Sequence, residues 1–322
     1  MNSECNFYES GCGSSDAESV TLQPMADHPF ITVIPPRSID FDGFPVRRML
    51  PHRGLRGVGP WVFFDHMGPF DFPPGRGIDV IPHPHINLAT VTYLFDGRIT
   101  HRDSLGNEQD ISPGAVNLMV AGRGIAHSER TPPDLRAKGH RVHGLQLWHA
   151  LPAAVEESDP GFLHYDAAEI PEISRDGVDL RILIGSLENL TSPVTAFLPT
   201  VYVEARIPAD RRWVLPDGIT ERGIYGVEGR VRVNDRPLDA GEFAVLTPEA
   251  LTVEADRDSR LVLIGGDSPG DRYIWWNFVS SRRDRIEKAQ SDWKSGRFPK
   301  VAGDDGERAP LPAADHHARM LE

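Results

Sequence analysis

The chain has 322 residues, enough for two domains that each bury a core. Its hydrophobic content of 39% and charged content of 25% are typical of a soluble globular protein and exclude a fibrous or largely disordered chain. The formal net charge of −13 excludes direct nucleic-acid binding over the general surface, because phosphates would be repelled.

Residues 1–28 are predicted to form a disordered leader. They are rich in Ser, Gly, Asp and Glu, and they lack the basic and apolar regions of a signal peptide. Both cysteines, Cys5 and Cys12, lie here, so we interpret them as reduced thiols and exclude a disulfide scaffold for the folded part. No apolar run reaches the roughly 18–20 residues of a membrane span. We therefore predict a cytoplasmic protein that makes no contact with membranes.

The next segment, residues 29–165, is predicted to be an N-terminal domain of short strands. Its apolar runs are punctuated by Pro and Gly, which favours strands joined by tight turns. His66 could orient a metal ligand, but a structural histidine in a turn is the preferred interpretation. His52, beside Arg53, is interpreted as solvated.

Two pairs of metal-capable residues give the strongest signal in this domain. His83 and His85 are two residues apart, as are His127 and Glu129. Residues i and i+2 of a strand point to the same face, so two adjacent strands would gather three imidazoles and one carboxylate. A single His-x-His is more often a surface or packing feature. The second pair, which follows the glycine-rich turn at residues 122–124, favours a mononuclear metal site.

The segment between the two pairs is predicted to form an antiparallel meander. A run rich in β-branched and aromatic residues is followed by Asp96-Gly97, a strong hairpin signal. His101, just past this hairpin, could compete as a metal ligand, but its polar neighbours favour an exposed side chain. After Glu129, a strand that alternates in polarity places Gln146 and Trp148 on one face, where they are candidates to line a cavity above the metal. Packing alone explains Trp148 equally well.

The second half, residues 166–302, is predicted to repeat the first as a C-terminal domain. Residues 93–97 match residues 225–229, and residues 112–119 match residues 239–246 further on. The ligand positions then fall near four residues that are not histidine: Leu215, Asp217, Glu254 and Asp256. A solvated acidic surface is the preferred interpretation of these carboxylates, and a weak hard-cation site is the alternative.

The domain ends in a predicted helix of about four turns. Ile286, Ala289 and Trp293 recur at helical spacing, and Trp293 is expected to pack on a sheet. Residues 303–322 form a polar, Pro-rich tail that we expect to be ordered only by docking. The adjacent His316 and His317 are interpreted as adventitious.

Several motifs together resemble the pirin family of the cupin superfamily, over residues 30–302. They are VRRMLP, GPWVFFDHMGP, PHPHINLATVTYLFDGRITHRDSLG, AGRGIAHSER, GLQLW and WWNFVSSRRDRIEKAQSDWKSGRFPKV. The resemblance implies an all-β bicupin, in which two antiparallel cupin-type β-barrels face each other, with a C-terminal helix. It implies one iron in the N-terminal barrel and a degenerate second cupin domain. The iron ligands would be His83, His85, His127 and Glu129. The chain departs from the family pattern at Asn87, where glycine is common, and at Leu118, where tryptophan is frequent.

The predicted ligands suit Fe²⁺, but imidazole and carboxylate also bind Mn, Ni, Cu or Zn. Four protein ligands would leave an octahedral metal two open positions, for a substrate oxygen and O₂. Glu129 is the residue we expect to act as a base toward a substrate hydroxyl. The resemblance implies a quercetin 2,3-dioxygenase-like reaction on a flavonol or another small enol or phenol.

The main alternative is a metal- or redox-sensing regulator that binds a protein partner. The resemblance also implies this role, as a transcriptional co-regulator or a modulator of a metabolic enzyme. A pocket of roughly 300 Å³ or more above the metal would favour catalysis. A closed pocket beside an exposed acidic or apolar patch would favour regulation. A metal that only stabilises the fold, or a sugar-phosphate isomerase, are the remaining alternatives.

Overall fold

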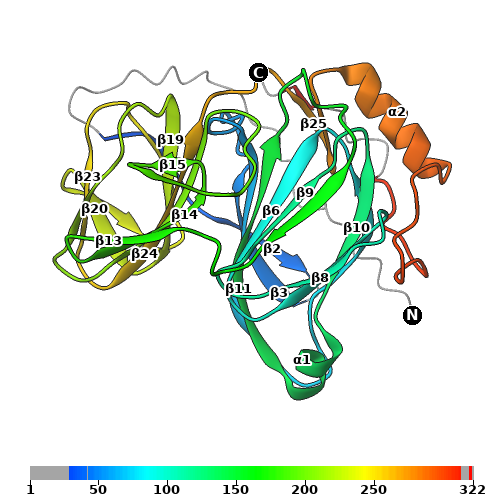
Figure 1. Cartoon of the computed structure of the whole chain (residues 1–322), viewed down its shortest axis with the longest axis horizontal. Helices are drawn as coiled ribbons and strands as arrows, with labels where there is room; N and C mark the ends of the chain where they lie inside the picture. Colours follow the sequence, from blue (N-terminus) through cyan, green and yellow to red (C-terminus); the bar gives the residue numbers. More distant parts are fainter. Residues whose placement is uncertain (1–28, 42, 313–318, 321–322) are drawn as a thin grey trace, which may run out of the picture.

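The computed structural model describes residues 29–41, 43–312 and 319–320. Almost all of its elements are β-strands, and they form two barrels that lie side by side (Figure 1). This confirms the predicted fold of two antiparallel cupin-type barrels with a C-terminal helix. The predicted leader, with Cys5 and Cys12, lies outside the described residues.

The first barrel consists of a seven-stranded sheet and a four-stranded sheet that faces it. The seven-stranded sheet has, in spatial order, β12 (Gly161–Tyr165), β9 (Val116–Val120), β6 (Leu88–Asp96), β11 (His140–Ala150), β4 (Trp61–Phe72), β3 (Phe44–Leu50) and β2 (Arg37–Phe41). The four-stranded sheet has β5 (Asp79–His85), β10 (Ile125–Arg130), β7 (Ile99–Asp103) and β8 (Glu108–Ile111). The predicted meander between the two metal-capable pairs therefore contributes strands to both sheets.

The second barrel has the same plan. Its seven-stranded sheet has β1 (Phe30–Ile34), β22 (Phe243–Leu246), β19 (Glu221–Glu228), β24 (Ser259–Gly266), β17 (Thr200–Ile207), β14 (Val178–Ile184) and β13 (Glu172–Arg175). Its four-stranded sheet has β18 (Arg212–Val214), β23 (Thr252–Ala255), β20 (Arg230–Val233) and β21 (Arg236–Asp239). A short hairpin of β15 (Ser186–Leu187) and β16 (Leu190–Thr191) follows β14.

The two seven-stranded sheets pack against each other and build the central hydrophobic core. Side chains of both barrels interdigitate there: the Phe64 ring lies 5.0 Å from Tyr225 and 5.8 Å from Phe243. Tyr93 of β6 donates its hydroxyl hydrogen to Glu204 of β17. Because strand side chains alternate between faces, Val91 and Tyr93 point to this core while Thr92 points into the first barrel.

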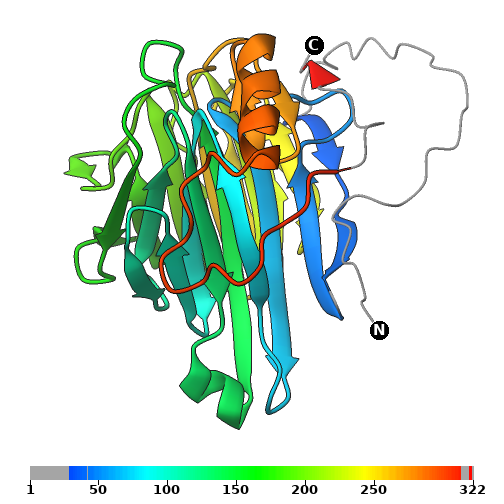
Figure 2. The ribbon, with the colours of Figure 1, turned by 90° about the vertical axis from the view of Figure 1, so that its right-hand side faces the viewer.

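The first described strand and the last long described segment are exchanged between the barrels. β1 pairs with β22 of the second barrel, although the predicted N-terminal domain began at residue 29. Conversely, the segment after β24 packs on the first barrel, with Trp275, Phe278 and Trp293 in one cluster with Ile86 of that barrel. Figure 2 shows the chain after the helix crossing the strands of the first barrel. With predicted domain boundaries at residues 29 and 302, β1 was assigned to the first barrel and the segment after β24 to the second. Each packs on the other barrel.

The predicted C-terminal helix is α2 (Arg283–Lys294), of 12 residues, and Ile286, Ala289 and Trp293 are its buried positions. A short helix, α1 (Pro133–Lys138), lies in the connection between β10 and β11. Before α2 lie β25 (Tyr273–Trp275) and β26 (Phe278–Ser280), which share a small sheet with β27 (Arg319–Met320). Among the described helices, none has the length and apolar character needed to span a membrane.

The described part of the tail docks on the first barrel. The indole N–H of Trp293 donates to the carbonyl of Ala309 at 2.9 Å. Asp304 accepts hydrogen bonds at 2.9 and 3.0 Å from the guanidinium of Arg130, the residue that ends β10. His316 and His317 lie outside the described residues.

Candidate metal centre

Three histidines converge inside the first barrel. His83 of β5 lies opposite His127 of β10, and His85 follows two residues later on the same strand. Their ligand nitrogens lie within 4.8 Å of one another, and all three side chains are buried. Among the residues that the structure describes, this is the only cluster of three or more metal-capable side chains. The geometry agrees with the i, i+2 argument for these histidines.

In each of the three rings the hydrogen bond is made by Nδ1, which leaves Nε2 free. The Nδ1 of His83 lies 2.9 Å from the carbonyl of Ile81, and the Nδ1 of His85 lies 3.0 Å from the carbonyl of Asn277. A carbonyl only accepts, so each Nδ1 carries the hydrogen and each Nε2 keeps its lone pair. The Nε2 of His127 is buried and has no hydrogen-bond partner within the described part of the chain. Three free lone pairs facing one point suit a metal ion.

Burial keeps these imidazoles neutral. It lowers the pKa of His83 to about 4, although the hydrogen bond to the Ile81 carbonyl acts in the opposite direction. Burial first, and the neighbouring imidazoles second, hold the pKa of His85 and of His127 well below the usual value. A metal ion binds only neutral imidazole, so the site is ready for a metal at neutral pH without losing protons first.

A second hydrogen-bonded chain orients His127. Its Nδ1 lies 3.4 Å from the Nδ1 of His101, whose Nε2 lies 3.2 Å from the carboxylate of Asp103. Because the carboxylate accepts, His101 donates through Nε2 and accepts through Nδ1, so His127 carries its hydrogen on Nδ1. Asp103 is itself held by the side-chain and backbone N–H groups of Asn107. Such outer contacts fix the orientation of a metal ligand.

His101 was expected to be exposed, and this expectation was wrong. Only 4% of the residue is accessible, and its ring stacks on Phe162 at 4.3 Å. The polar neighbours that suggested a strand end belong to the other face of β7 or, in the case of Asp103, serve as its hydrogen-bond partner. Phe162 comes from β12, far along the chain from His101, so the local sequence gave no signal for this burial.

Glu129 lies on β10 beside this cluster, but its carboxylate is not one of the three converging ligand atoms. The carboxylate accepts a hydrogen bond of 3.4 Å from the hydroxyl of Thr92. That hydroxyl also lies 2.7 Å from the side-chain oxygen of Gln146. Burial raises the pKa of Glu129, and the neighbouring His101 partly offsets this effect. Its role as the fourth metal ligand stays a prediction.

The two residues predicted to line a cavity above the metal both lie at the site. Gln146 contacts Thr92, as described above, and the ring of Trp148 lies 5.0 Å from that of His85. Phe63 stacks on the other side of Trp148, with ring centroids 3.9 Å apart. The aromatic pair therefore forms one wall of the metal centre.

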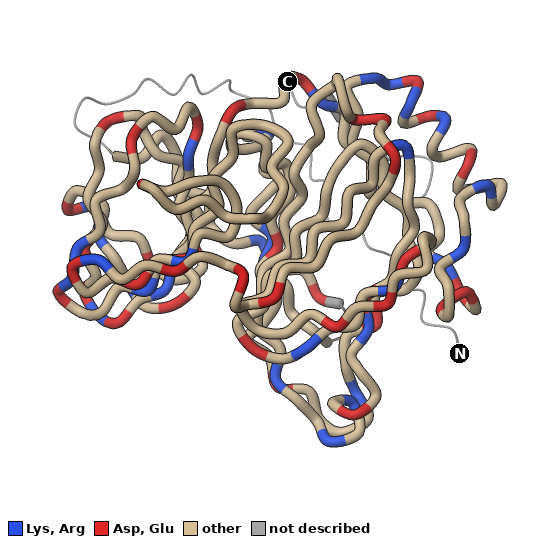
Figure 3. Tube along the Cα trace, in the orientation of Figure 1, with Lys and Arg blue, Asp and Glu red and all other residues tan. Residues whose placement is uncertain are grey.

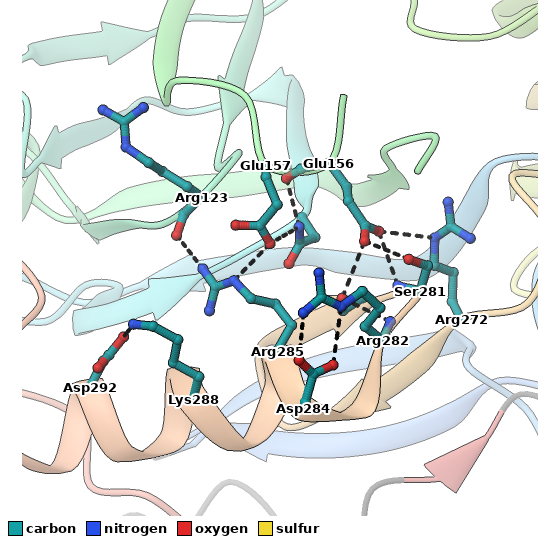
Figure 4. A network of polar contacts seen from close by, with 12 residues as sticks. Arg123, Glu156, Glu157, Arg272, Ser281, Arg282, Asp284, Arg285, Lys288 and Asp292 are labelled. Atoms are coloured by element: carbon teal, nitrogen blue, oxygen red, sulfur yellow. Dashed lines mark hydrogen bonds and ion pairs between the residues drawn. The ribbon is translucent and has the colours of Figure 1, made fainter. Parts of the chain in front are cut away.

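A polar network fixes the turn that leads into β10 (Figure 4). Arg285, in the first turn of α2, donates to the backbone carbonyl of Arg123 in this turn and to the carboxylate of Glu157. The adjacent Glu156 accepts hydrogen bonds from the backbone N–H and the hydroxyl of Ser281, just before α2. The C-terminal segment thus supports the strand that carries the third histidine, and it also supplies the carbonyl that orients the second.

The remaining predicted positions lie away from the histidine cluster. His66 lies within β4 rather than in a turn, and its ring nitrogens lie 2.6 Å from the Tyr225 hydroxyl and 2.8 Å from His143, so its contacts are structural. His52 is exposed, as expected. Leu118 packs in the core between the barrels.

Asn87 follows the second histidine and adopts a positive φ of 58°. Asparagine tolerates this conformation better than most residues, which explains how it fits a position where the family resemblance led us to expect glycine. Its side-chain amide donates to the backbone carbonyl of Glu156 at 2.7 Å and to the Glu157 carboxylate at 2.8 Å. Asn87 is therefore part of the polar network that holds the turn before β10.

Two of the three carboxylates predicted near the ligand positions of the second barrel, Glu254 and Asp256, form ion pairs with arginine. Arg232 lies 3.0 Å from Glu254 and 2.7 Å from Asp256. Acidic and basic residues alternate along this end of the second barrel, whereas the middle of the long strands in the first barrel carries few charges (Figure 3). The arrangement agrees with a solvated charged surface rather than a cation site.

The comparisons with known proteins agree with this geometry. The Pirin family model matches residues 43–149, and the Pirin C-terminal cupin domain model matches residues 202–299. A pirin-like protein of Caulobacter vibrioides is 45% identical over 280 residues, which are 86% of this chain and 97% of that protein. The chain belongs to the pirin family.

Further similar proteins come from a eukaryote and from another bacterium. Human pirin is 29% identical over 268 residues, which are 79% of this chain and 88% of that protein. A crystal structure of quercetin 2,3-dioxygenase from Acinetobacter baumannii matches with a TM-score of 0.84 at 35% identity, over 90% of this chain and 98% of that one. The family and the bicupin fold predicted from the sequence motifs are both confirmed.

Proposed function

We propose that this pirin is a metal-dependent dioxygenase of the quercetin type, with Fe²⁺ as its native metal. Its substrate would be a flavonol or another small enol or phenol, and O₂ would be the second substrate. The observation that carries the proposal is the convergence of three neutral imidazoles on one point inside a barrel. The 35% identity to a quercetin 2,3-dioxygenase supports the choice of reaction.

Each residue of the centre would have its own role. His83, His85 and His127 would hold the metal through their Nε2 atoms, with the carboxylate of Glu129 as fourth ligand. A bound iron would supply the redox chemistry through which O₂ reacts with an electron-rich organic molecule.

Glu129 would also take the proton of a substrate hydroxyl, because it follows His127 by two residues on β10 and burial raises its pKa. Thr92 would position Glu129 through its hydroxyl, and Gln146 would in turn fix the place of that hydroxyl. The Phe63–Trp148 pair would bound the site on one side and exclude water there. Specificity for the organic substrate would then depend on residues that line this wall.

The test is oxygen uptake with quercetin, using anaerobically Fe²⁺-loaded protein. Wild type should consume O₂, and the His85→Ala variant should not. A His164→Ala variant serves as the matched control, because His164 lies on β12 of the same barrel and hydrogen-bonds Asn117 rather than a ligand. Repeating the assay with Mn, Ni, Cu and Zn identifies the metal that supports turnover.

Absence of uptake in protein that holds one iron per chain would overturn the dioxygenase proposal. The regulatory alternative, in which the metal state controls binding to a protein partner, would then be the function to test. A cytoplasmic location stays a prediction in either case.

A further inference from the structure

The second barrel contains a large cavity that the proposed function does not use. Its volume is about 1380 Å³, and it opens at the end of the barrel near the β15–β16 hairpin and the loop after β18. Its apolar lining includes Leu180, Leu187, Val194, Val201, Trp213 and Leu215. All six are buried, and five of them belong to the core of this barrel.

Strand register shows how this end of the second barrel relates to the metal centre. In the first barrel, Glu129 of β10 lies opposite His101 of β7. In the second barrel, Val253 of β23 lies opposite Val233 of β20. Val233 follows His101 by the same offset that separates Tyr225 from Tyr93 in the two repeats. Val253 therefore occupies the position of Glu129.

The same register locates the counterparts of two histidines. Two residues before Val253 is Leu251, at the position of His127. The backbone N–H of Leu215 donates to the carbonyl of Leu251 at 2.9 Å, just as His83 lies opposite His127. Leucine thus replaces both histidines. The positions near Glu254 and Asp256 that the sequence repeat suggested are too far along the chain, because the second copy has a shorter connection.

The polar residues beside the metal are replaced as well. Ile224 stands at the repeat position of Thr92, and each lies opposite a residue of the neighbouring strand, Leu263 in the second barrel and Gln146 in the first. An aliphatic pair therefore occupies the place of the hydroxyl and amide that contact the carboxylate of the metal centre.

The aromatic wall is missing from the second barrel. Phe63 lies opposite Trp148 in the first barrel, and Val201 lies opposite Gly265 at the equivalent strand positions. A Cβ atom at Gly265 would lie 2.3 Å from the backbone oxygen of Glu221, so this position holds no side chain. Two stacked rings are thus replaced by one valine, and Val201 lines the cavity.

Several polar groups that line the cavity make contacts within the chain, and exposed charged residues such as Asp176, Arg211 and Asp217 lie at its rim. The hydroxyl of Ser192 donates to the carbonyl of Leu183, and that of Thr200 donates to the carbonyl of Leu198, both at 2.7 Å. At the rim, Arg175 forms an ion pair with Glu188. A ligand that took Ser192 or Thr200 as a hydrogen-bond partner would have to break these contacts, whereas an apolar ligand against the buried aliphatic lining would gain from burial alone.

We propose that the second barrel binds an uncharged, hydrophobic small molecule in this cavity, with an aromatic ring in contact with Trp213. The end of a cupin barrel that holds the metal in the first domain has become an apolar binding site in the second. Apolar cavities in proteins take up ligands of this kind because both the ligand and the cavity wall lose contact with water.

The test uses N-phenyl-1-naphthylamine, an uncharged apolar fluorophore, titrated into the full-length, metal-loaded chain. Its fluorescence should rise and saturate with wild type. The Val201→Phe variant restores the residue found in the first barrel and fills the cavity, so the dissociation constant should increase about tenfold or more. Near-ultraviolet circular dichroism and the thermal midpoint establish that this variant is folded.

A second variant keeps the test decisive if Val201→Phe does not fold. Val214 lines the cavity at its rim and is 68% exposed, so a Val214→Asp substitution adds a charge there without disturbing the core. It should weaken binding severalfold. Val33→Asp is the matched control, because Val33 is 37% exposed on β1 of the same barrel and does not line the cavity.

Unchanged affinity in the control together with weaker binding by the folded cavity variants would support the proposal. Failure of wild type to bind the fluorophore would overturn it. Equal affinity in wild type, Val201→Phe and Val214→Asp would also overturn it, because the fluorophore would then bind elsewhere.

Discussion

The two barrels have the same arrangement of strands, but the side chains that point into their interiors differ. The first barrel gathers three imidazoles, with a hydroxyl, an amide and a carboxylate beside them, and the second has leucine, valine and isoleucine at most of the aligned positions, with Asp217 at that of His85. The strand register is the same in both. The shared strand plan therefore fixes the positions of the side chains. A small number of residues decides whether the barrel contains a cluster of metal-capable side chains or an apolar core.

The difference also has an energetic side. Aliphatic side chains stabilise the second barrel by burial alone. The first barrel instead buries the Nε2 of His127 without a partner, and an unsatisfied buried group typically costs about 1–3 kcal/mol. A bound metal removes this cost. The stability of the first barrel should therefore depend on the metal, and that of the second should not.

The largest expected effect comes from removing a ligand. The His127→Ala variant should lose its bound metal almost completely, because two imidazoles remain of the three that converge. Metal content measured by inductively coupled plasma mass spectrometry should fall from about one ion per chain to near zero. A control change in the second barrel, Glu254→Gln, should leave the content unchanged, since that carboxylate pairs with Arg232. Equal metal loss in both variants would contradict the distinction between the barrels.

A second prediction concerns the exchange of chain ends. Trp293 belongs to the C-terminal half of the sequence but packs in a cluster with residues of the first barrel. Trp293→Ala should lower the free energy of unfolding by about 3–5 kcal/mol, as is typical for a buried aromatic residue. Hydrogen exchange should show the loss of protection in β5 and β10, with the strands of the second barrel little affected. Loss confined to the second barrel would show that α2 supports its own half.

The pH dependence of stability should also distinguish the barrels. Burial lowers the pKa of His83, His143 and His149 to about 4, from an ordinary value of 6.5. Between these values the unfolded chain takes up protons that the folded chain does not. The free energy of unfolding of metal-free protein should therefore fall as the pH drops from about 6.5 to about 4, by up to about 1.4 kcal/mol per pH unit for each histidine.

Denaturant titrations at several pH values measure how the free energy of unfolding changes with pH. Hydrogen exchange shows which strands lose protection. The sequence contains no histidine between His164 and His316, so protection should be lost first in the first barrel and at its interface. A His149→Leu variant should have a smaller slope than wild type. A stability that stays constant over this range would contradict the neutral, buried state of these rings.

Local patterns in the sequence were sufficient for the histidine cluster and for the repeat. The i, i+2 spacing of His83 and His85 depends only on strand geometry, which neighbouring β-branched residues specify. The match between Tyr93 and Tyr225 is reflected in the structure, where both tyrosines point into the core between the barrels. Features of this kind can be predicted because residues close in sequence determine them.

The parts that sequence reasoning missed depend on contacts between distant segments. His101 is buried by Phe162 of another strand, and the orientation of His85 depends on a backbone carbonyl at Asn277, which has no side-chain signal. The pairing of β1 with the second barrel likewise follows from packing, not from local pattern. Only Asp103, two residues after His101, offered a local hint that the two side chains share a face.

The smallest predicted effect tests this missed contact. His101→Phe keeps the ring that stacks on Phe162 but removes the acceptor for the Nδ1 hydrogen of His127. Loss of such an outer contact typically weakens metal binding about 10–100-fold. Competition with a chelator of known affinity measures the change, and His164→Phe on β12 is the matched control.

Asp103→Asn should weaken metal binding in the same direction, because an amide holds the His101 ring less firmly than a carboxylate does. Combining the two substitutions should add little to either one alone, since both act through the same hydrogen-bonded chain. Additive losses would show that His101 and Asp103 act on the metal centre independently. Unchanged affinity in both single variants would show that burial alone orients His127, and that the first barrel needs no more than its three converging rings.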